Sequence, residues 1–177
     1  TGVYPGTSGE IIFDGQHIRG LASDDIVVRG VARTFQNIRL FAHMTALENV
    51  MVGRHARTAQ FLLGPLFRTR AFHEEESATE VKAKELLDFV GLKALGNELA
   101  KNLPYGAQRR LEIARALASE PKLLILDEPT AGMNPTECRE LVALVRLVRE
   151  RGVTVLLIEH QMRVVMDISD RVFGFDY

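Results

Sequence analysis

The chain has 177 residues, of which 46% are hydrophobic and 25% are charged, which is the balance of an ordinary globular domain. Its formal net charge of −1 excludes a global basic field that would draw the chain to nucleic acid or to an anionic membrane surface. The single cysteine, Cys138, excludes an internal disulfide, and no apolar run reaches the roughly 20 residues of a membrane-spanning helix, so any membrane association would come through a partner.

Local signals predict the elements of the first half of the chain. Asp14-Gly15 is a strong two-residue turn signal between two β-rich runs. Ser23 is expected to cap a short helix, and Thr45 with Glu48 forms the sequence pattern of a capping box. The expected elements are a hairpin over 10–13 and 16–18, a helix over 23–28, a strand over 31–36, a helix from 45 to about 57, an irregular connection over 61–72 and a helix over 74–90.

The second half alternates helices with strands. The expected elements are a helix over about 107–119, a strand over 123–126, a helix over 135–151, a strand over 153–158, a helix over 162–168 and a strand over 171–175. These strands are continuous apolar runs, which are typical of a parallel sheet buried on both faces. We therefore expect an α/β core over 1–38 and 120–177, with a helical subdomain over about 39–119.

Polar residues follow two of these apolar runs. Asp127 and Glu128 end the run 123–126, which places them at the carboxyl end of a strand, where open α/β sheets bind ligands. One acid suits a Mg²⁺ ion and the other suits an attacking water, the two roles that phosphoryl transfer needs. His160 follows the run 156–158 and is able to hydrogen-bond a phosphate. Each segment alone also fits a purely structural reading, a buried strand followed by a solvated turn.

A glycine, Gly106, lies at the expected start of the helix that precedes the two acids. Glycine lets the backbone approach a ligand closely, and the free N–H groups and dipole of a helix start favour phosphate. An ordinary helix start that is rich in proline and glycine has the same composition, so this segment gains meaning only from its neighbours.

Taken together, these segments resemble the ATP-binding-cassette (ABC) ATPases, a P-loop NTPase-like family with a helix-flanked parallel sheet, a small antiparallel β part and a helical subdomain. The matching segments, in order, are Phe35-Gln36 (Q-loop), Leu103 to Gln108 (signature motif, usually LSGGQ), Asp127 with Glu128 (Walker B and catalytic glutamate), 131–134 (D-loop) and His160 (switch histidine). The resemblance implies catalytic roles for Glu128, His160 and Gln36, and Mg²⁺ ligation by Asp127 and Gln36. It implies contact with ATP for Leu103, Pro104, Tyr105, Gly106, Ala107, Gln108 and Asn134.

Segments 33–37, 44–54, 105–115 and 131–135 are similar to the ATPases of branched-chain amino-acid importers, the LivG type. This resemblance implies ATP hydrolysis that drives amino-acid import, a head-to-tail dimer with a second ABC ATPase subunit, and transmembrane permease partners. It also implies a peripheral place at the cytoplasmic face of the plasma membrane and no nucleic-acid partner. The rival hypotheses are a non-transport ABC ATPase that acts on ribosomes or DNA, and a degenerate module that has lost catalysis.

The sequence departs from the family pattern in two ways. No GxxxxGK[ST] loop occurs, residues 1–4 resemble the segment that follows it, and residues 171–177 have a strand pattern that is cut at its end, so we expect a chain truncated at both ends. Because that loop holds the β- and γ-phosphates, the 177 residues alone are expected neither to bind ATP tightly nor to hydrolyse it. Pro104 stands where the family commonly has a serine that contacts the γ-phosphate, and such a lost bond to a charged group costs roughly 1.5–3 kcal/mol. Tyr105, Ala107 and Asn134 also differ from the general pattern.

Overall fold

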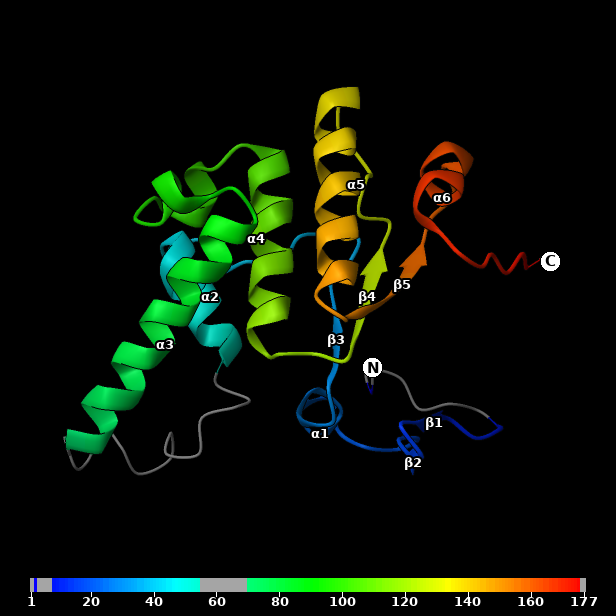
Figure 1. Ribbon diagram of the computed structural model, residues 1–177, viewed down its shortest axis with the longest axis horizontal. Helices are drawn as coiled ribbons and strands as arrows, with labels where there is room; N and C mark the ends of the chain where they lie inside the picture. Colours follow the sequence, from blue (N-terminus) through cyan, green and yellow to red (C-terminus); the bar gives the residue numbers. More distant parts are fainter. Residues whose placement is uncertain (1, 3–7, 55–69, 176–177) are drawn as a thin grey trace.

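The computed structural model describes residues 2, 8–54 and 70–175, with side chains described from 75 onward in the second range. The elements in chain order are β1 Ile12–Phe13, β2 Gln16–His17, α1 Ser23–Val28, β3 Val31–Arg33, α2 Ala46–Gly53, α3 Arg70–Phe89, the 3₁₀ turns η2 Lys93–Leu95 and η3 Ala100–Asn102, α4 Tyr105–Ala118, β4 Leu123–Asp127, α5 Pro135–Glu150, β5 Thr154–Ile158 and α6 Met162–Ile168 (Figure 1).

The central sheet is parallel, with the strand order β3-β4-β5, and β1 pairs with β2 in a separate antiparallel hairpin. Arg33 lies opposite Ile125 on β4, and Asp127 lies opposite Ile158 on β5. The carboxyl ends of all three strands therefore meet at one edge of the sheet. The predicted α/β class with a small antiparallel part is confirmed.

Turn and cap signals fold locally, as their chemistry predicts. Asp14 and Gly15 both have positive φ, 50° and 73°, as the central residues of a tight hairpin turn require. Thr45 and Glu48 form the predicted capping box of α2, in which each side chain binds the other residue's backbone N–H. The cap predicted for α1 is wrong, because the N-cap residue is Ala22, which has no side-chain acceptor, and Ser23 is the first helical residue.

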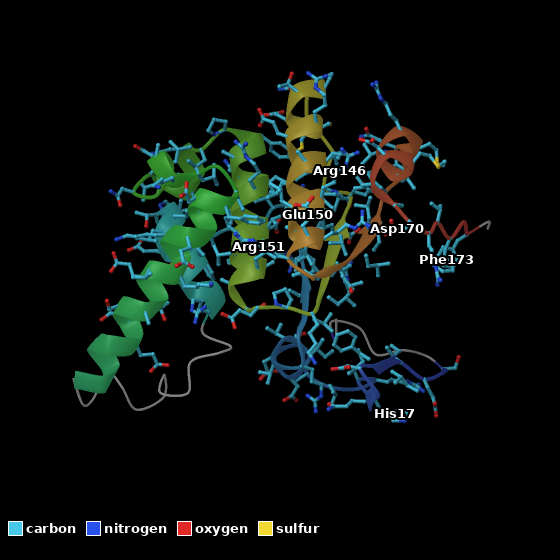
Figure 2. The ribbon with its side chains drawn as sticks, viewed as in Figure 1. His17, Arg146, Glu150, Arg151, Asp170 and Phe173 are labelled. Atoms are coloured by element: carbon cyan, nitrogen blue, oxygen red, sulfur yellow. The ribbon has the colours of Figure 1, made fainter. Side chains whose placement is uncertain are left out.

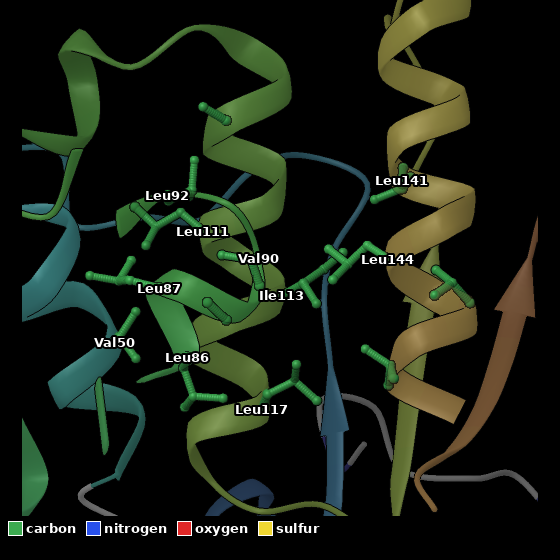
Figure 3. Packing of buried hydrophobic residues seen from close by; sticks show 14 of the residues in the cluster. Val50, Leu86, Leu87, Val90, Leu92, Leu111, Ile113, Leu117, Leu141 and Leu144 are labelled. Carbon is green, nitrogen blue, oxygen red and sulfur yellow. The ribbon is translucent and has the colours of Figure 1, made fainter. Parts of the chain in front are cut away.

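One hydrophobic core runs from α2 and α3 through α4 to β4 and α5. Leu111 and Ile113 of α4 are almost fully buried, and Ile113 faces Leu144 of α5 across the gap between the two helices (Figure 3). At the end of α5, the guanidinium carbon of Arg151 lies 3.5 Å from the ring centroid of Phe89 on α3. The helical part therefore packs directly against the sheet part, and α4 carries most of that contact.

The two faces of the sheet are covered unequally within the described residues, since the face that includes the buried Val31 of β3 is exposed on β5. Leu124 and Leu126 of β4 are fully buried against the helices, whereas Leu156 and Ile158 of β5, which point to the other face, are 47% and 45% exposed. The prediction of strands buried on both faces is therefore wrong for β5 within the described residues. A continuous apolar run carries no information about which segment covers each face.

The strand predicted over residues 171–175 is wrong, because these residues form no strand. A strand needs a hydrogen-bonding neighbour, and the described residues provide none beyond β5; Phe173 instead projects from the segment that follows α6, 76% exposed (Figure 2). Arg146 and Arg149 of α5 hold the segment around α6 through Asp167 and Asp170.

Several expected boundaries also move. The strand predicted over 31–36 ends at Arg33, α3 begins at Arg70 rather than at residue 74, and α4 begins two residues before the expected position. Residues 61–69 of the expected irregular connection, and most of residues 1–4, lie outside the described residues. None of the described helices is both long and apolar enough to cross a bilayer.

Candidate active site

The carboxyl edge of the sheet carries the two acids. Asp127 is the last residue of β4, and Glu128 follows it with a φ of 42°, in the left-handed region. The Glu128 N–H donates to the Ile158 carbonyl at 2.8 Å, which fixes this conformation against β5. A non-glycine residue in this region costs about 1–3 kcal/mol and is concentrated at functional sites.

Three predicted catalytic residues meet at this edge. Nε2 of Gln36, after β3, donates to Oε2 of Glu128 at 2.7 Å. Oε1 of Glu128 lies 3.6 Å from Nδ1 of His160, after β5. That distance is too long for a hydrogen bond, but it places an imidazole and a carboxylate around one small volume. His160 is 69% exposed at its side chain, so it is free to meet a ligand.

Asp127 is held by a cation from the neighbouring strand. Nη2 of Arg33 lies 2.5 Å from Oδ2 of Asp127, and the Arg33 guanidinium also lies over the ring of Phe35. Within the described residues, no three His, Cys, Asp or Glu side chains gather into a metal cage. Mg²⁺ bound with a nucleotide needs only one or two protein oxygen ligands, with phosphates and waters for the rest. The Asp127 carboxylate and the Gln36 amide oxygen fit that mode when the Arg33 guanidinium moves away from Asp127.

Glu159 is a site residue that sequence reasoning missed. Its side chain is fully buried and accepts four hydrogen bonds. Oε1 accepts from the N–H and the hydroxyl of Thr130, while Oε2 accepts from the N–H groups of His160 at 2.9 Å and Gln161 at 3.3 Å. Glu159 thus ties the loop of His160 to the loop that follows Glu128. The sequence signal for Glu159 is its place as a polar residue at the end of the apolar run 156–158, directly before His160.

The signature residues begin α4 and contact the D-loop. Pro104 is the N-cap residue of α4 and provides no side-chain cap, in line with its lack of a hydroxyl. Gln108 Nε2 donates to the Leu103 carbonyl at 2.8 Å and closes the turn. The Tyr105 hydroxyl donates to the Ala131 carbonyl at 2.9 Å. Ala107 is buried, so its side chain serves packing.

Gly106 lets the start of α4 approach the start of α5 closely. A Cβ at Gly106 would lie 2.7 Å from Oε1 of Glu137. Glu137 is itself held in a capping box with Asn134, whose Oδ1 accepts from the N–H groups of Thr136 and Glu137. The Asn134 side chain, expected to contact ATP, is therefore engaged as a helix cap in this structure. Its predicted contact with ATP stays a prediction.

The predicted residues fall into two groups. Gln36, Glu128 and His160 lie together, with Asp127 beside them. Within the described part of the chain, the signature residues make no hydrogen bond to these three side chains. Burial, and next the charges of Glu159 and Glu137, raise the pKa of the Cys138 thiol, which lowers its thiolate fraction. The first group gathers an amide, a carboxylate and an imidazole at the carboxyl edge of the sheet, and the second lies at the start of α4.

Comparisons with known proteins show the family of the chain. The ABC transporter family matches residues 1–131, and the chain belongs to that family. The high-affinity branched-chain amino acid transport ATP-binding protein BraF of Pseudomonas aeruginosa is 48% identical over 173 residues, covering 97% of this chain and 68% of that protein. The corresponding protein LivG of Escherichia coli is 44% identical over 174 residues, covering 98% and 68%.

Solved structures extend the comparison to the fold. The ADP conformation of MJ1267, an ATP-binding cassette of an ABC transporter, has a TM-score of 0.78 at 31% identity, covering 96% of this chain and 66% of that one.

The glutamine transport ATP-binding protein GlnQ of Escherichia coli is a more distant relative by sequence, 35% identical over 96% of this chain. The chain thus spans about two thirds of the length of the relatives that it matches.

Proposed function

We propose that this chain belongs to the ATP-binding and ATP-hydrolysing subunit of an importer for branched-chain amino acids. The observation that carries the chemistry is the convergence of Gln36, Glu128 and His160 at the carboxyl edge of the sheet. The substrate class rests on the printed names of two relatives, BraF and LivG, at 48% and 44% identity.

The residues divide the work of phosphoryl transfer. Glu128 polarises the attacking water, and Gln36 keeps the Glu128 carboxylate in place through the 2.7 Å hydrogen bond. His160, exposed beside Glu128, donates to the γ-phosphate of ATP. Asp127 and the amide oxygen of Gln36 are the residues that would hold Mg²⁺, which neutralises charge on the phosphates when bound. Catalysis of this kind depends mainly on positioning and charge, which a loop cluster on rigid strands supplies.

A second ABC ATPase subunit completes the site in this proposal. The signature residues make no hydrogen bond to the side chains of Gln36, Glu128 and His160 within the described residues, so their N–H groups suit the ATP held by a head-to-tail partner. Closure of that dimer on ATP would move transmembrane permease subunits, with the chain bound peripherally at the cytoplasmic face of the membrane. Because the chain spans about two thirds of the length of its relatives, activity is measured on the full-length protein, of the relatives' length.

The direct test is transport in vesicles that contain the full-length protein and its permease subunits. ATP enclosed with the ATPase side should drive uptake of labelled leucine, and excess unlabelled isoleucine or valine should compete, whereas glutamine should not. Uptake that glutamine blocks and isoleucine does not would contradict the proposed substrate class. ATP hydrolysis that no amino acid or binding protein stimulates would contradict coupling to import.

A further inference from the structure

Arg109, on the first half of α4, is a charged side chain with no exposure to solvent. Its Nη1 donates to the Phe35 carbonyl at 2.7 Å and its Nη2 donates to the Gln36 carbonyl at 2.7 Å. Nη2 also donates to the Tyr105 hydroxyl at 3.1 Å. A buried guanidinium is costly unless it is paired and hydrogen-bonded. Here both Nη atoms donate to the backbone of a loop more than 70 residues away in the chain, while Nε has no hydrogen-bond partner within the described residues.

Glu112, one turn further along α4, contacts both Arg109 and that loop. Its Oε2 pairs with Nη1 of Arg109 at 3.0 Å, and its Oε1 accepts from the N–H of Arg39 at 3.3 Å. Glu112 is only 1% exposed. The Arg109–Glu112 pair therefore binds the Q-loop at both ends, through carbonyls at 35 and 36 and through an N–H at 39.

We propose that Arg109 is a positioning residue that sets Gln36 against Glu128 and couples the Q-loop to the signature turn. This inference rests on the proposed function. Gln36 is fixed at its carbonyl by Arg109 and reaches Glu128 with its side chain at 2.7 Å. Arg109 therefore acts on the reacting groups only through the backbone of Gln36.

The same guanidinium is linked to the signature and D-loop. The Tyr105 hydroxyl accepts from Arg109 and donates to the Ala131 carbonyl, three residues after Glu128. A movement of the signature turn thus reaches Gln36 through two hydrogen bonds. In a head-to-tail dimer, the signature turn contacts one ATP and Gln36 contacts the other. Arg109 would then transmit closure of one ATP site to Gln36 at the other ATP site.

Arginine is required because one planar fork serves several acceptors in fixed directions, whereas the ammonium of lysine is a single point. Arg109→Lys keeps the charge and the pair with Glu112 but cannot hold both carbonyls. Arg110→Lys is the matched control. Arg110 is the next residue on α4, and its Nη1 pairs at 2.9 Å with Glu140, whose side chain is half exposed. Such pairs contribute little.

The test measures two properties of the full-length protein with its permease partners. Hydrogen exchange should become faster at residues 36–39 in Arg109→Lys and stay unchanged in the second half of α4. The kcat for ATP should fall by about 10- to 100-fold with KM within about threefold, because a misplacement of about 1 Å costs on the order of 100-fold. Arg110→Lys should match the parent in both. Unchanged exchange at 36–39, or a kcat equal to that of the control, would overturn the proposal.

A second variant keeps the proposal testable if Arg109→Lys fails to fold. Tyr105→Phe removes one hydroxyl from a partly exposed side chain and should also lower kcat, together with faster exchange at residues 130–133. Where both single variants fold, the double variant should lose no more than the stronger single variant, because the two residues act in one chain of bonds. Additive losses would contradict the coupling. The hydrogen-exchange measurements need no ATP turnover. A parent protein without ATPase activity would therefore contradict the proposed function, while exchange at residues 36–39 would still decide whether Arg109 positions the Q-loop.

Discussion

Nε2 of Gln36 donates a 2.7 Å hydrogen bond to Oε2 of Glu128, although the two residues are 92 positions apart in the chain. The parallel pairing of β3 with β4 makes this possible, because it brings the ends of both strands to one edge. The bond orients the carboxylate that we assign to water activation. It also makes the Gln36 side chain sensitive to whatever binds beside Glu128.

Replacing Gln36 by alanine tests that orientation. In the full-length protein, Gln36→Ala should lower kcat for ATP by about 10- to 100-fold, the rate equivalent of a lost hydrogen bond to a charged group, roughly 1.5–3 kcal/mol. ATP affinity should change much less. Asn37→Ala, at the exposed neighbouring residue, is the control and should retain the parent rate. A normal rate in Gln36→Ala would remove Gln36 from the catalytic group.

The close approach at Gly106 predicts a size limit. In Gly106→Ala the new methyl group would lie 2.7 Å from Oε1 of Glu137 and displace that side chain from the capping box of α5. Loss of such a cap costs about 1 kcal/mol, so the urea midpoint should fall and ATPase activity should fall with it. Gly96→Ala is the control, because its methyl group would meet only ordinary contacts, at 3.5 Å or more. Equal stability of the two variants would contradict the close packing of Gly106 against Glu137.

Glu159 offers a test of the buried link between two loops. Glu159→Gln keeps the shape but replaces an acceptor by an NH₂ group that faces N–H donors. We expect a loss of about 1.5–3 kcal/mol in the free energy of unfolding, the range for hydrogen bonds to a charged group. Urea denaturation of the full-length protein measures it. Glu140→Gln, which breaks only a half-exposed pair, should stay within about 0.5 kcal/mol of the parent.

The capping box of α2 predicts an acid-dependent contribution to stability. The backbone N–H of Thr45, followed by its hydroxyl, lowers the pKa of Glu48 from its ordinary value of 4.5. Because the folded-state pKa lies below the unfolded one, the stabilisation is present above pH 4.5 and is lost as the pH falls through the folded-state pKa. The difference in Tm between the parent and Glu48→Gln should therefore shrink between about pH 6 and about pH 3. A difference that is independent of pH would show that the Glu48 charge does not contribute.

Local chemistry explains which features were predictable. Asp14-Gly15 and the Thr45–Glu48 box need only their own few residues, and both formed as expected. The acids after β4 and His160 after β5 were found because polar groups at the end of apolar runs mark the ligand edge of a parallel sheet. The fold class followed from the alternation of such runs with helices.

Long-range partners explain the rest. Nothing in the sequence near Arg109 or Glu112 says that these charges are buried, since their acceptors and donors lie at residues 35–39. The apolar residues of β5 and of residues 171–175 do not indicate which other segment packs against them. The cap that Asn134 forms on α5 is local instead, and the contact of Asn134 with ATP stays a prediction.

The measurement that bears most directly on the central claim is ATP binding and hydrolysis by the full-length protein with Glu128→Gln. The carboxylate that polarises water would be lost, while the groups that bind nucleotide would remain. We expect hydrolysis to fall by at least about 100-fold, on the scale of a lost general base, with ATP affinity within about threefold of the parent. Hydrolysis at the parent rate would contradict the assignment of Glu128 and, with it, this account of the site.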